Sequence, residues 1–175
     1  MSESLMPARH LENQKAPYNV LFLCTGNSAR SIMAESILNK IGKGRFQAFS
    51  AGSHPKGQVH PQAMTLLRQH GFDTGRLRSK SWSEFVDAGA PALDFVITVC
   101  EANEICPSWP GQPMSARWGM PDPAMVESTP EDIAEAFGEA YRLLTGRLSV
   151  FVNLNMTGLV RLALQKQVQD TADRE

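Results

Sequence analysis

The chain has 175 residues, which favours one domain with enough residues for a substantial core. Its net charge of −1 excludes the strongly basic class of nucleic-acid-binding or anionic-membrane-binding proteins. No apolar run has membrane-spanning length, and the first residues lack the apolar segment of a signal peptide, so we expect a cytoplasmic protein. An odd number of cysteines, three, favours reactive or buried thiols over a disulfide-stapled secreted domain.

Residues 1–17 are polar and show no periodicity, so they are expected to form a disordered leader. A catalytic domain is expected over residues 18–170. Within it, strands are predicted at 19–23, 46–50, 93–99 and 114–118. Helices are predicted at 29–41, 60–71, 81–85, 129–152 and around 159–168. The alternation predicts an α/β three-layer sandwich, with a four-stranded parallel sheet and helices on both faces.

The first predicted strand ends in Cys24, and small, turn-favouring residues follow it up to the first helix. Gly26 and Asn27 tolerate positive φ, which lets the loop turn its amide hydrogens inward. A loop of this kind, closed by a helix N-terminus and a guanidinium, binds tetrahedral oxyanions. The predicted oxyanion-binding residues are Thr25, Gly26, Asn27, Ser28, Ala29, Arg30 and Ser31.

The same surroundings predict that Cys24 is a nucleophile. A thiol beside a guanidinium and a helix N-terminus loses its proton more easily, and the thiolate is the attacking form. Ser31 could donate a hydrogen bond to the sulfur. The alternative is a buried cysteine at a strand end with a surface arginine nearby.

Two further candidates follow later strands. Cys100 comes directly after the strand at 93–99, and Asp122 lies between two prolines shortly after the strand at 114–118. Because the carboxyl ends of parallel strands share one edge, both should lie near Cys24. Asp122 is a candidate general acid or a turn-stabilising residue. Cys100 could equally be a small buried apolar residue.

Residues 24–31, followed by Met33-Ala34-Glu35, resemble the low-molecular-weight protein tyrosine phosphatase superfamily, and more closely its arsenate reductase branch. The segments at 50–52 and 118–123 also match, so the resemblance covers roughly residues 18–165. It implies the low-molecular-weight phosphatase fold and thiol-dependent reduction of arsenate to arsenite. It also implies Cys24 as nucleophile, Arg30 as oxyanion ligand and Asp122 as general acid.

In that branch a second cysteine attacks the arsenate-bearing cysteine, and arsenite leaves as a disulfide forms. In the thioredoxin-coupled group a third cysteine then resolves this bond. The resemblance assigns these roles to Cys100 and Cys106. It implies no bound cofactor, but an external reductant, either thioredoxin or glutathione with glutaredoxin. Both routes stay open, because the spacing from Cys100 to Cys106 is shorter than in comparable relatives.

Two other functions remain open. The first is a low-molecular-weight tyrosine phosphatase that hydrolyses phosphomonoesters through a phosphocysteine. Against it, Ala124 and Met125 follow the Asp-Pro pair where such phosphatases carry aromatic residues. The second is a regulator that binds phosphate without chemistry. No metal site is expected, since Cys100 and Cys106 lack a second close pair of cysteines or histidines.

Overall fold

The computed structural model describes residues 16–101, 106–160, 162 and 165–166. Residues 1–15 of the expected leader therefore lie outside the described residues, as does half of the helix expected around 159–168. Residues 156–160 are helical. In the described part of the chain, no helix is both long and apolar enough to cross a membrane.

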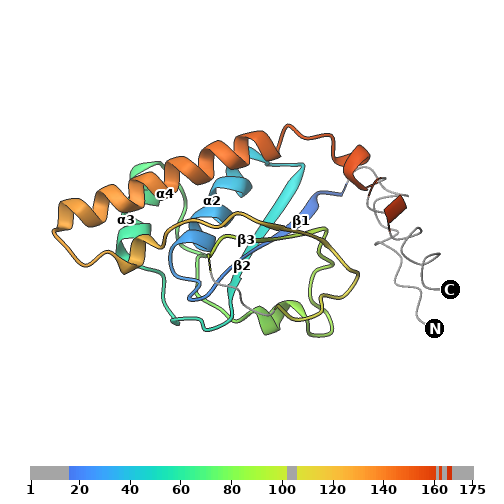
Figure 1. Cartoon of the computed structure of the whole chain (residues 1–175), viewed down its shortest axis with the longest axis horizontal. Helices are drawn as coiled ribbons and strands as arrows, with labels where there is room; N and C mark the ends of the chain where they lie inside the picture. The colour runs from blue at the N-terminus through green and yellow to red at the C-terminus, as the bar shows by residue number, and fades with distance from the viewer. Residues whose placement is uncertain (1–15, 102–105, 161, 163–164, 167–175) are drawn as a thin grey trace.

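The core of the fold is a sheet of four parallel strands in the order β2-β1-β3-β4 (Figure 1). The strands run over Tyr18–Cys24 (β1), Phe46–Gly52 (β2), Phe95–Thr98 (β3) and Met114–Arg117 (β4). The third strand is shorter than the predicted 93–99. Next to its start, the Asp94 carboxylate accepts the amide hydrogen of Asn19 at 2.7 Å, and the Asp94 amide donates to the Asn19 carbonyl at 2.9 Å.

In the part of the chain that the structure describes, three longer α-helices and two 3-10 helices surround the sheet. They are α2 (Arg30–Ile41), α3 (Pro61–Gln69), α4 (Pro130–Phe151), η1 (Trp82–Phe85) and η2 (Pro123–Met125). Side chains cap α3, η1 and α4: the acceptors are His60, Ser81 and Thr129. Proline in the first turn of α3 and α4 fits a position whose amide has no helical partner.

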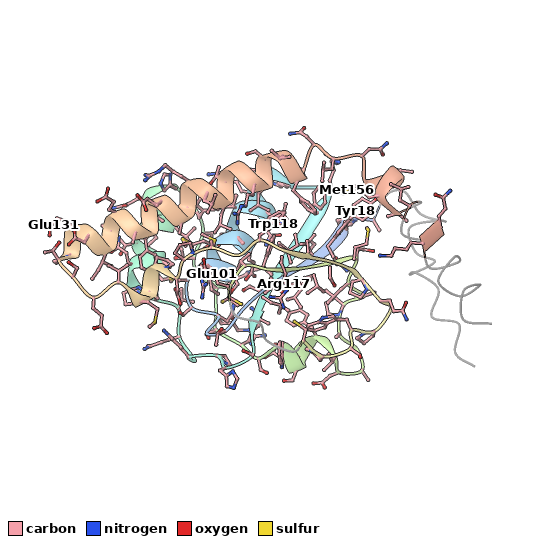
Figure 2. The ribbon with its side chains drawn as sticks, in the orientation of Figure 1. Tyr18, Glu101, Arg117, Trp118, Glu131 and Met156 are labelled. Carbon is pink, nitrogen blue, oxygen red and sulfur yellow. The ribbon has the colours of Figure 1, made fainter. Side chains whose placement is uncertain are left out.

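The predicted four-stranded parallel sheet with helices on both faces is confirmed, although the two faces are covered unequally. Helices α2, α3 and α4 pack on one face, where Phe22 and Leu144 are completely buried. Trp118 lies between this face and α4, with ring contacts to Phe22 and Phe151 (Figure 2). The opposite face is covered by η1 and loops, including Trp109.

The strand order places the end of β1 at a special point. The chain passes from β1 to β2 on one side, and β3 pairs with β1 on the other side. Ligands of open α/β sheets bind outside the carboxyl ends of the strands, where the order reverses. The loop after Cys24 occupies this position.

Candidate active site

The loop after β1 is held from outside by the segment that follows β2. The amides of His54, Lys56 and His60 donate to the carbonyls of Thr25, Gly26 and Ser28, at 2.8–2.9 Å. The N–H and C=O of a planar trans peptide point in opposite directions. In each of these three peptide groups the carbonyl points outward, so the N–H of the same group points into the loop. The predicted oxyanion cradle requires this orientation.

The Cys24 sulfur lies inside this loop. The Asn27 amide donates to it at 3.2 Å, and Ser31 Oγ lies 2.9 Å from it. Asn27 has a φ of 42°, the left-handed conformation expected from the sequence. Its side chain is fully buried and donates to Ser31 Oγ at 2.8 Å. These contacts fix two donor groups beside the sulfur, where they would stabilise a thiolate.

Gly52, the last residue of β2, lets the loop approach the sheet. A β-carbon there would lie 2.5 Å from the Thr25 carbonyl oxygen and 3.0 Å from the Asn27 nitrogen. Both atoms belong to the backbone and cannot rotate away. The resemblance included this glycine, but the close approach explains why no other residue fits.

Arg30 begins α2 and lies beside Asp122. Its Nη2 is 3.0 Å from Asp122 Oδ2, and its Nη1 donates to the Met120 carbonyl at 3.0 Å. The guanidinium side chain is only 7% exposed, whereas that of Asp122 is 27% exposed. Asp122 also accepts the Ala124 amide at 3.0 Å, so it has the turn role considered above. The carboxylate is held at the guanidinium that would bind the oxyanion.

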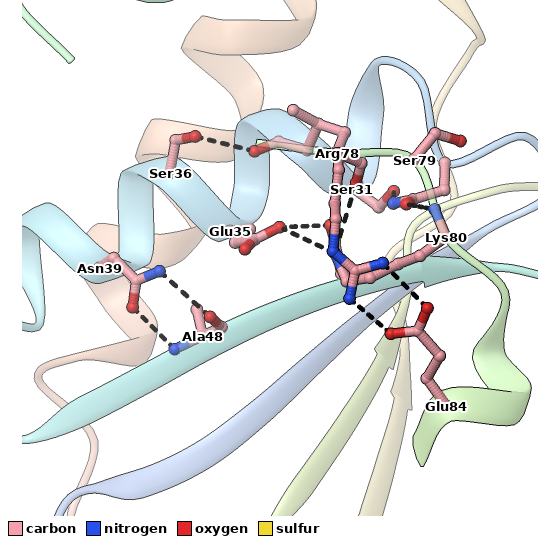
Figure 3. Close-up of polar contacts among 12 residues, drawn as sticks. Ser31, Glu35, Ser36, Asn39, Ala48, Arg78, Ser79, Lys80 and Glu84 are labelled. Atoms are coloured by element: carbon pink, nitrogen blue, oxygen red, sulfur yellow. Dashed lines mark hydrogen bonds and ion pairs between the residues drawn. The ribbon is translucent and has the colours of Figure 1, made fainter. Parts of the chain in front are cut away.

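A second ion pair lies behind the loop (Figure 3). Lys80 Nζ is 3.9 Å from Glu35 Oε2, and Ser50 Oγ donates to the same carboxylate. Burial raises the pKa of Glu35, while Lys80, Ser50 and Arg78 act in the opposite direction. For Lys80 the effect of burial has the opposite sign: burial lowers the pKa of its ammonium, and the nearby Glu35 carboxylate raises it. Each charge therefore depends on its partner.

The two further cysteines lie in different apolar clusters. Cys24 and Cys100 are both buried in the cluster that contains α2, α3 and α4. The Val99 amide donates to the Leu23 carbonyl at 2.8 Å, one residue before each cysteine. Cys106 packs instead in the cluster on the opposite face. The structure thus brings Cys100, but not Cys106, to the side of the sheet that carries Cys24.

Lys80 and Met120 were not singled out by the sequence. Lys80 sits in the polar run Arg78-Ser79-Lys80, which looks like an exposed loop, and charged side chains are rarely buried. Met120 contributes only its carbonyl, which leaves no trace in side-chain chemistry. Among the described residues, no group of three histidine, cysteine, aspartate or glutamate side chains could hold a metal ion.

Comparison with known proteins identifies the family. The family model for low molecular weight phosphotyrosine protein phosphatase matches residues 19–149. An arsenate reductase from Halalkalibacterium halodurans is 33% identical over 79% of this chain and 96% of its own length. An arsenate reductase from Brevibacillus brevis is 36% identical over 67% of this chain and 83% of its own length.

Solved structures agree with these sequence relatives. An arsenate reductase in a phosphate-binding state has a TM-score of 0.65 and 26% identity, covering 77% of this chain and 96% of that one. An arsenate reductase from Archaeoglobus fulgidus has a TM-score of 0.59 and 25% identity, covering 74% of this chain and 98% of that one. The chain therefore belongs to the low-molecular-weight phosphotyrosine protein phosphatase family, in the branch whose curated members are named arsenate reductases.

Proposed function

We propose that the protein is an arsenate reductase driven by an external thiol reductant. One observation carries the proposal: a second thiol, Cys100, shares the apolar cluster of the Cys24 sulfur that the oxyanion loop surrounds. Hydrolysis of a phosphate ester needs only the first thiol, whereas reduction of arsenic needs a second one. The named relatives support the same activity.

The chemistry begins with arsenate bound by the loop amides and Arg30. The Cys24 thiolate bonds to arsenic, and Asp122 supplies the proton with which one oxygen leaves as water. Cys100 then attacks the Cys24 sulfur. The electron pair of the sulfur–arsenic bond stays on arsenic, which leaves as arsenite while a Cys24–Cys100 disulfide forms.

Regeneration of the enzyme requires two electrons from outside. We assign the resolving role to Cys106, which would take over the disulfide and present it to the reductant. One structural neighbour is a thioredoxin-dependent arsenate reductase. At 24% identity, that neighbour supports the fold alone. Glutathione with glutaredoxin is the alternative, and it would bypass Cys106 through a mixed disulfide.

The proposal also includes the extent of the catalytic domain, the cellular location and a side reaction. Residues 18–170 form the catalytic domain, and the enzyme works in the cytoplasm, where arsenate meets reducing thiols. The loop, Arg30 and Asp122 would also support slow hydrolysis of aryl phosphates, because phosphate matches arsenate in shape and charge.

The test supplies arsenate with thioredoxin, thioredoxin reductase and NADPH, or with glutathione, glutaredoxin and their reductase. Arsenite formation is measured beside NADPH consumption, and aryl phosphate hydrolysis is measured in parallel. We expect arsenite in step with NADPH under at least one reductant. Hydrolysis without arsenite under either reductant would identify a phosphatase instead. Tight phosphate binding without any turnover would identify a binding protein.

A further inference from the structure

The ion pair behind the oxyanion loop has no part in the chemistry described above. Lys80 and Glu35 have side-chain exposures of only 8% and 16%. Lysine and glutamate are seldom buried to this extent unless they are paired, because removing a charge from water is costly. Their separation of 3.9 Å makes them partners at the outer limit of direct contact. A buried pair at this position requires an explanation.

Lys80 is joined to the nucleophile through two side chains. Its amide donates to Asn27 Oδ1 at 2.8 Å, and Asn27 Nδ2 donates to Ser31 Oγ at 2.8 Å. Ser31 Oγ lies 2.9 Å from the Cys24 sulfur. The bond to Asn27 comes from the Lys80 backbone, so a displacement of that backbone would shift the Asn27 side chain and, with it, the donors beside the sulfur.

Glu35 anchors the other end of the pair. It follows Ser31 by one turn of α2, so the two side chains lie on the same helical face. Ser50 Oγ of β2 donates to its carboxylate. The pair thus joins three segments around the loop: the start of α2, the end of β2 and residues 78–80 (Figure 3).

The other charges near the pair belong to Arg78 and Glu84. These two side chains are bound to each other at 2.6 and 2.9 Å, and both are exposed. Lys80 Nζ also donates to the Arg78 carbonyl at 3.4 Å. The surface pair thus places one charge of each sign near Lys80. The backbone of this segment is also bound to its surroundings, because the Gly52 amide donates to the Lys80 carbonyl at 2.9 Å and Ser79 Oγ donates to the Gly26 carbonyl at 3.2 Å. The Lys80–Glu35 pair, here called the clamp, adds the side-chain contact to these bonds.

We propose that Lys80 is a positioning residue whose ammonium, paired with Glu35, holds Asn27 and Ser31 against the Cys24 sulfur. It touches neither substrate nor sulfur and acts through these two side chains. The proposal rests on the proposed role of Cys24 as nucleophile. Its test uses a thiol readout that needs no turnover, so that failure of the clamp and failure of the reductase assignment are distinguishable.

The test measures iodoacetamide alkylation of Cys24 against pH, in a Cys100→Ser, Cys106→Ser background where Cys24 is the only cysteine. Lys80→Met keeps the aliphatic stem and removes the charge. We expect the pH of half-maximal reactivity to rise by about one unit, which equals about a tenfold loss of thiolate at a fixed lower pH. The kcat for aryl phosphate should fall about tenfold while KM changes less than about twofold, because Arg30 still binds the oxyanion.

Glu35→Gln separates positioning from a direct field. If the Lys80–Glu35 pair positions Asn27 and Ser31, losing it raises the pH of half-maximal alkylation, as in Lys80→Met. If the Glu35 charge instead acted directly on the Cys24 sulfur, removing this negative charge would lower the pH of half-maximal alkylation. That result overturns the proposal. Lys80→Arg, which keeps the cation, should recover most of the wild-type reactivity.

The matched control is Lys40→Met, which removes an exposed lysine from the far end of α2 and should leave the profile unchanged. If Lys80→Met fails to fold, Lys80→Met with Glu35→Gln leaves no unpaired charge and carries the same measurement. A folded Lys80→Met or double variant with the wild-type profile overturns the proposal.

Discussion

The two faces of the sheet differ in both packing and chemistry. Cys24 and Cys100 are buried on the face that α2, α3 and α4 cover. Cys106 is only half-buried and lies on the other face, beside Trp82 and Trp109. A disulfide between the first two cysteines can form within one packed region. In the proposed relay, transfer to the third would have to cross the edge of the sheet, which would separate bond making from reductant exchange in space.

The largest predicted effect follows from the helix-covered face. Cys24→Ser should abolish both arsenate reduction and aryl phosphate hydrolysis, with a loss of more than about ten-thousandfold in kcat. Cys100→Ser should abolish only arsenate reduction, because phosphate transfer requires no second thiol. Arsenite formation and aryl phosphate hydrolysis are measured for both variants. Arsenate reduction that persists in both would contradict the relay.

The opposite face, which carries the half-buried Cys106, predicts a smaller effect that depends on the reductant. Cys106→Ser should leave the first turnover intact, since Cys24 and Cys100 suffice for it. Repeated turnover with thioredoxin should fall below about a tenth of the wild-type rate, because the disulfide stays buried. A rapid-quench assay of arsenite separates the first turnover from later ones. Equal steady-state rates in variant and wild type would remove Cys106 from the mechanism.

The two faces should also differ in stability. Leu144 is completely buried on the helix-covered face, so Leu144→Ala should lower the free energy of unfolding by about 2–5 kcal/mol. Trp109 is partly exposed on the other face, and Trp109→Ala should cost about 1 kcal/mol. Urea unfolding of both variants gives the two values. A larger loss for Trp109→Ala would reverse the ranking of the faces.

The smallest predicted effect concerns His60, whose ring lies 4.7 Å from that of Phe137. Burial lowers the pKa of His60 below 6.5, Lys56 lowers it further, and Asp122 opposes both. As pH falls through 6.5, the unfolded chain therefore takes up a proton before the folded one, and folding stability is lost.

The variant His60→Asn keeps an acceptor at the helix cap and removes the titration. Relative to it, the wild type should lose stability between about pH 7 and pH 5. Urea unfolding at both ends of this range tests the sign. A difference between the two proteins that stays constant with pH would show that His60 does not titrate with folding.

The sequence predicted the parts of the site that depend on local spacing. A strand, a turn with Gly26 and Asn27, and Arg30 at the start of a helix define the oxyanion loop without long-range information. The shared strand edge also brought Asp122 to Arg30, because parallel strands direct their carboxyl ends to one side. These features follow from periodicity and connectivity alone.

Long-range features could not be predicted in this way. The burial of Lys80 depends on its approach to Glu35, which is 45 positions away in the chain and on another element. The face on which Cys106 packs depends on its tertiary contacts in the cluster with Trp82 and Trp109, and no local residue pattern encodes those contacts. The Asp94 carboxylate accepts the Asn19 amide hydrogen from 75 positions away in the chain, a contact that local spacing does not predict. Each outcome is decided by a tertiary contact.

The contact between Arg30 and Asp122 has a consequence for ligand selection. The Arg30 guanidinium is paired with a carboxylate of its own chain, that of Asp122. An incoming oxyanion must displace that tethered competitor, which is always present at high local concentration. A singly charged anion such as chloride interacts too weakly with Arg30 to displace Asp122, whereas a doubly charged tetrahedral ion binds both the guanidinium and the loop amides. We therefore expect the Arg30–Asp122 pairing to disfavour singly charged anions such as chloride, but not phosphate, which matches arsenate in shape and charge.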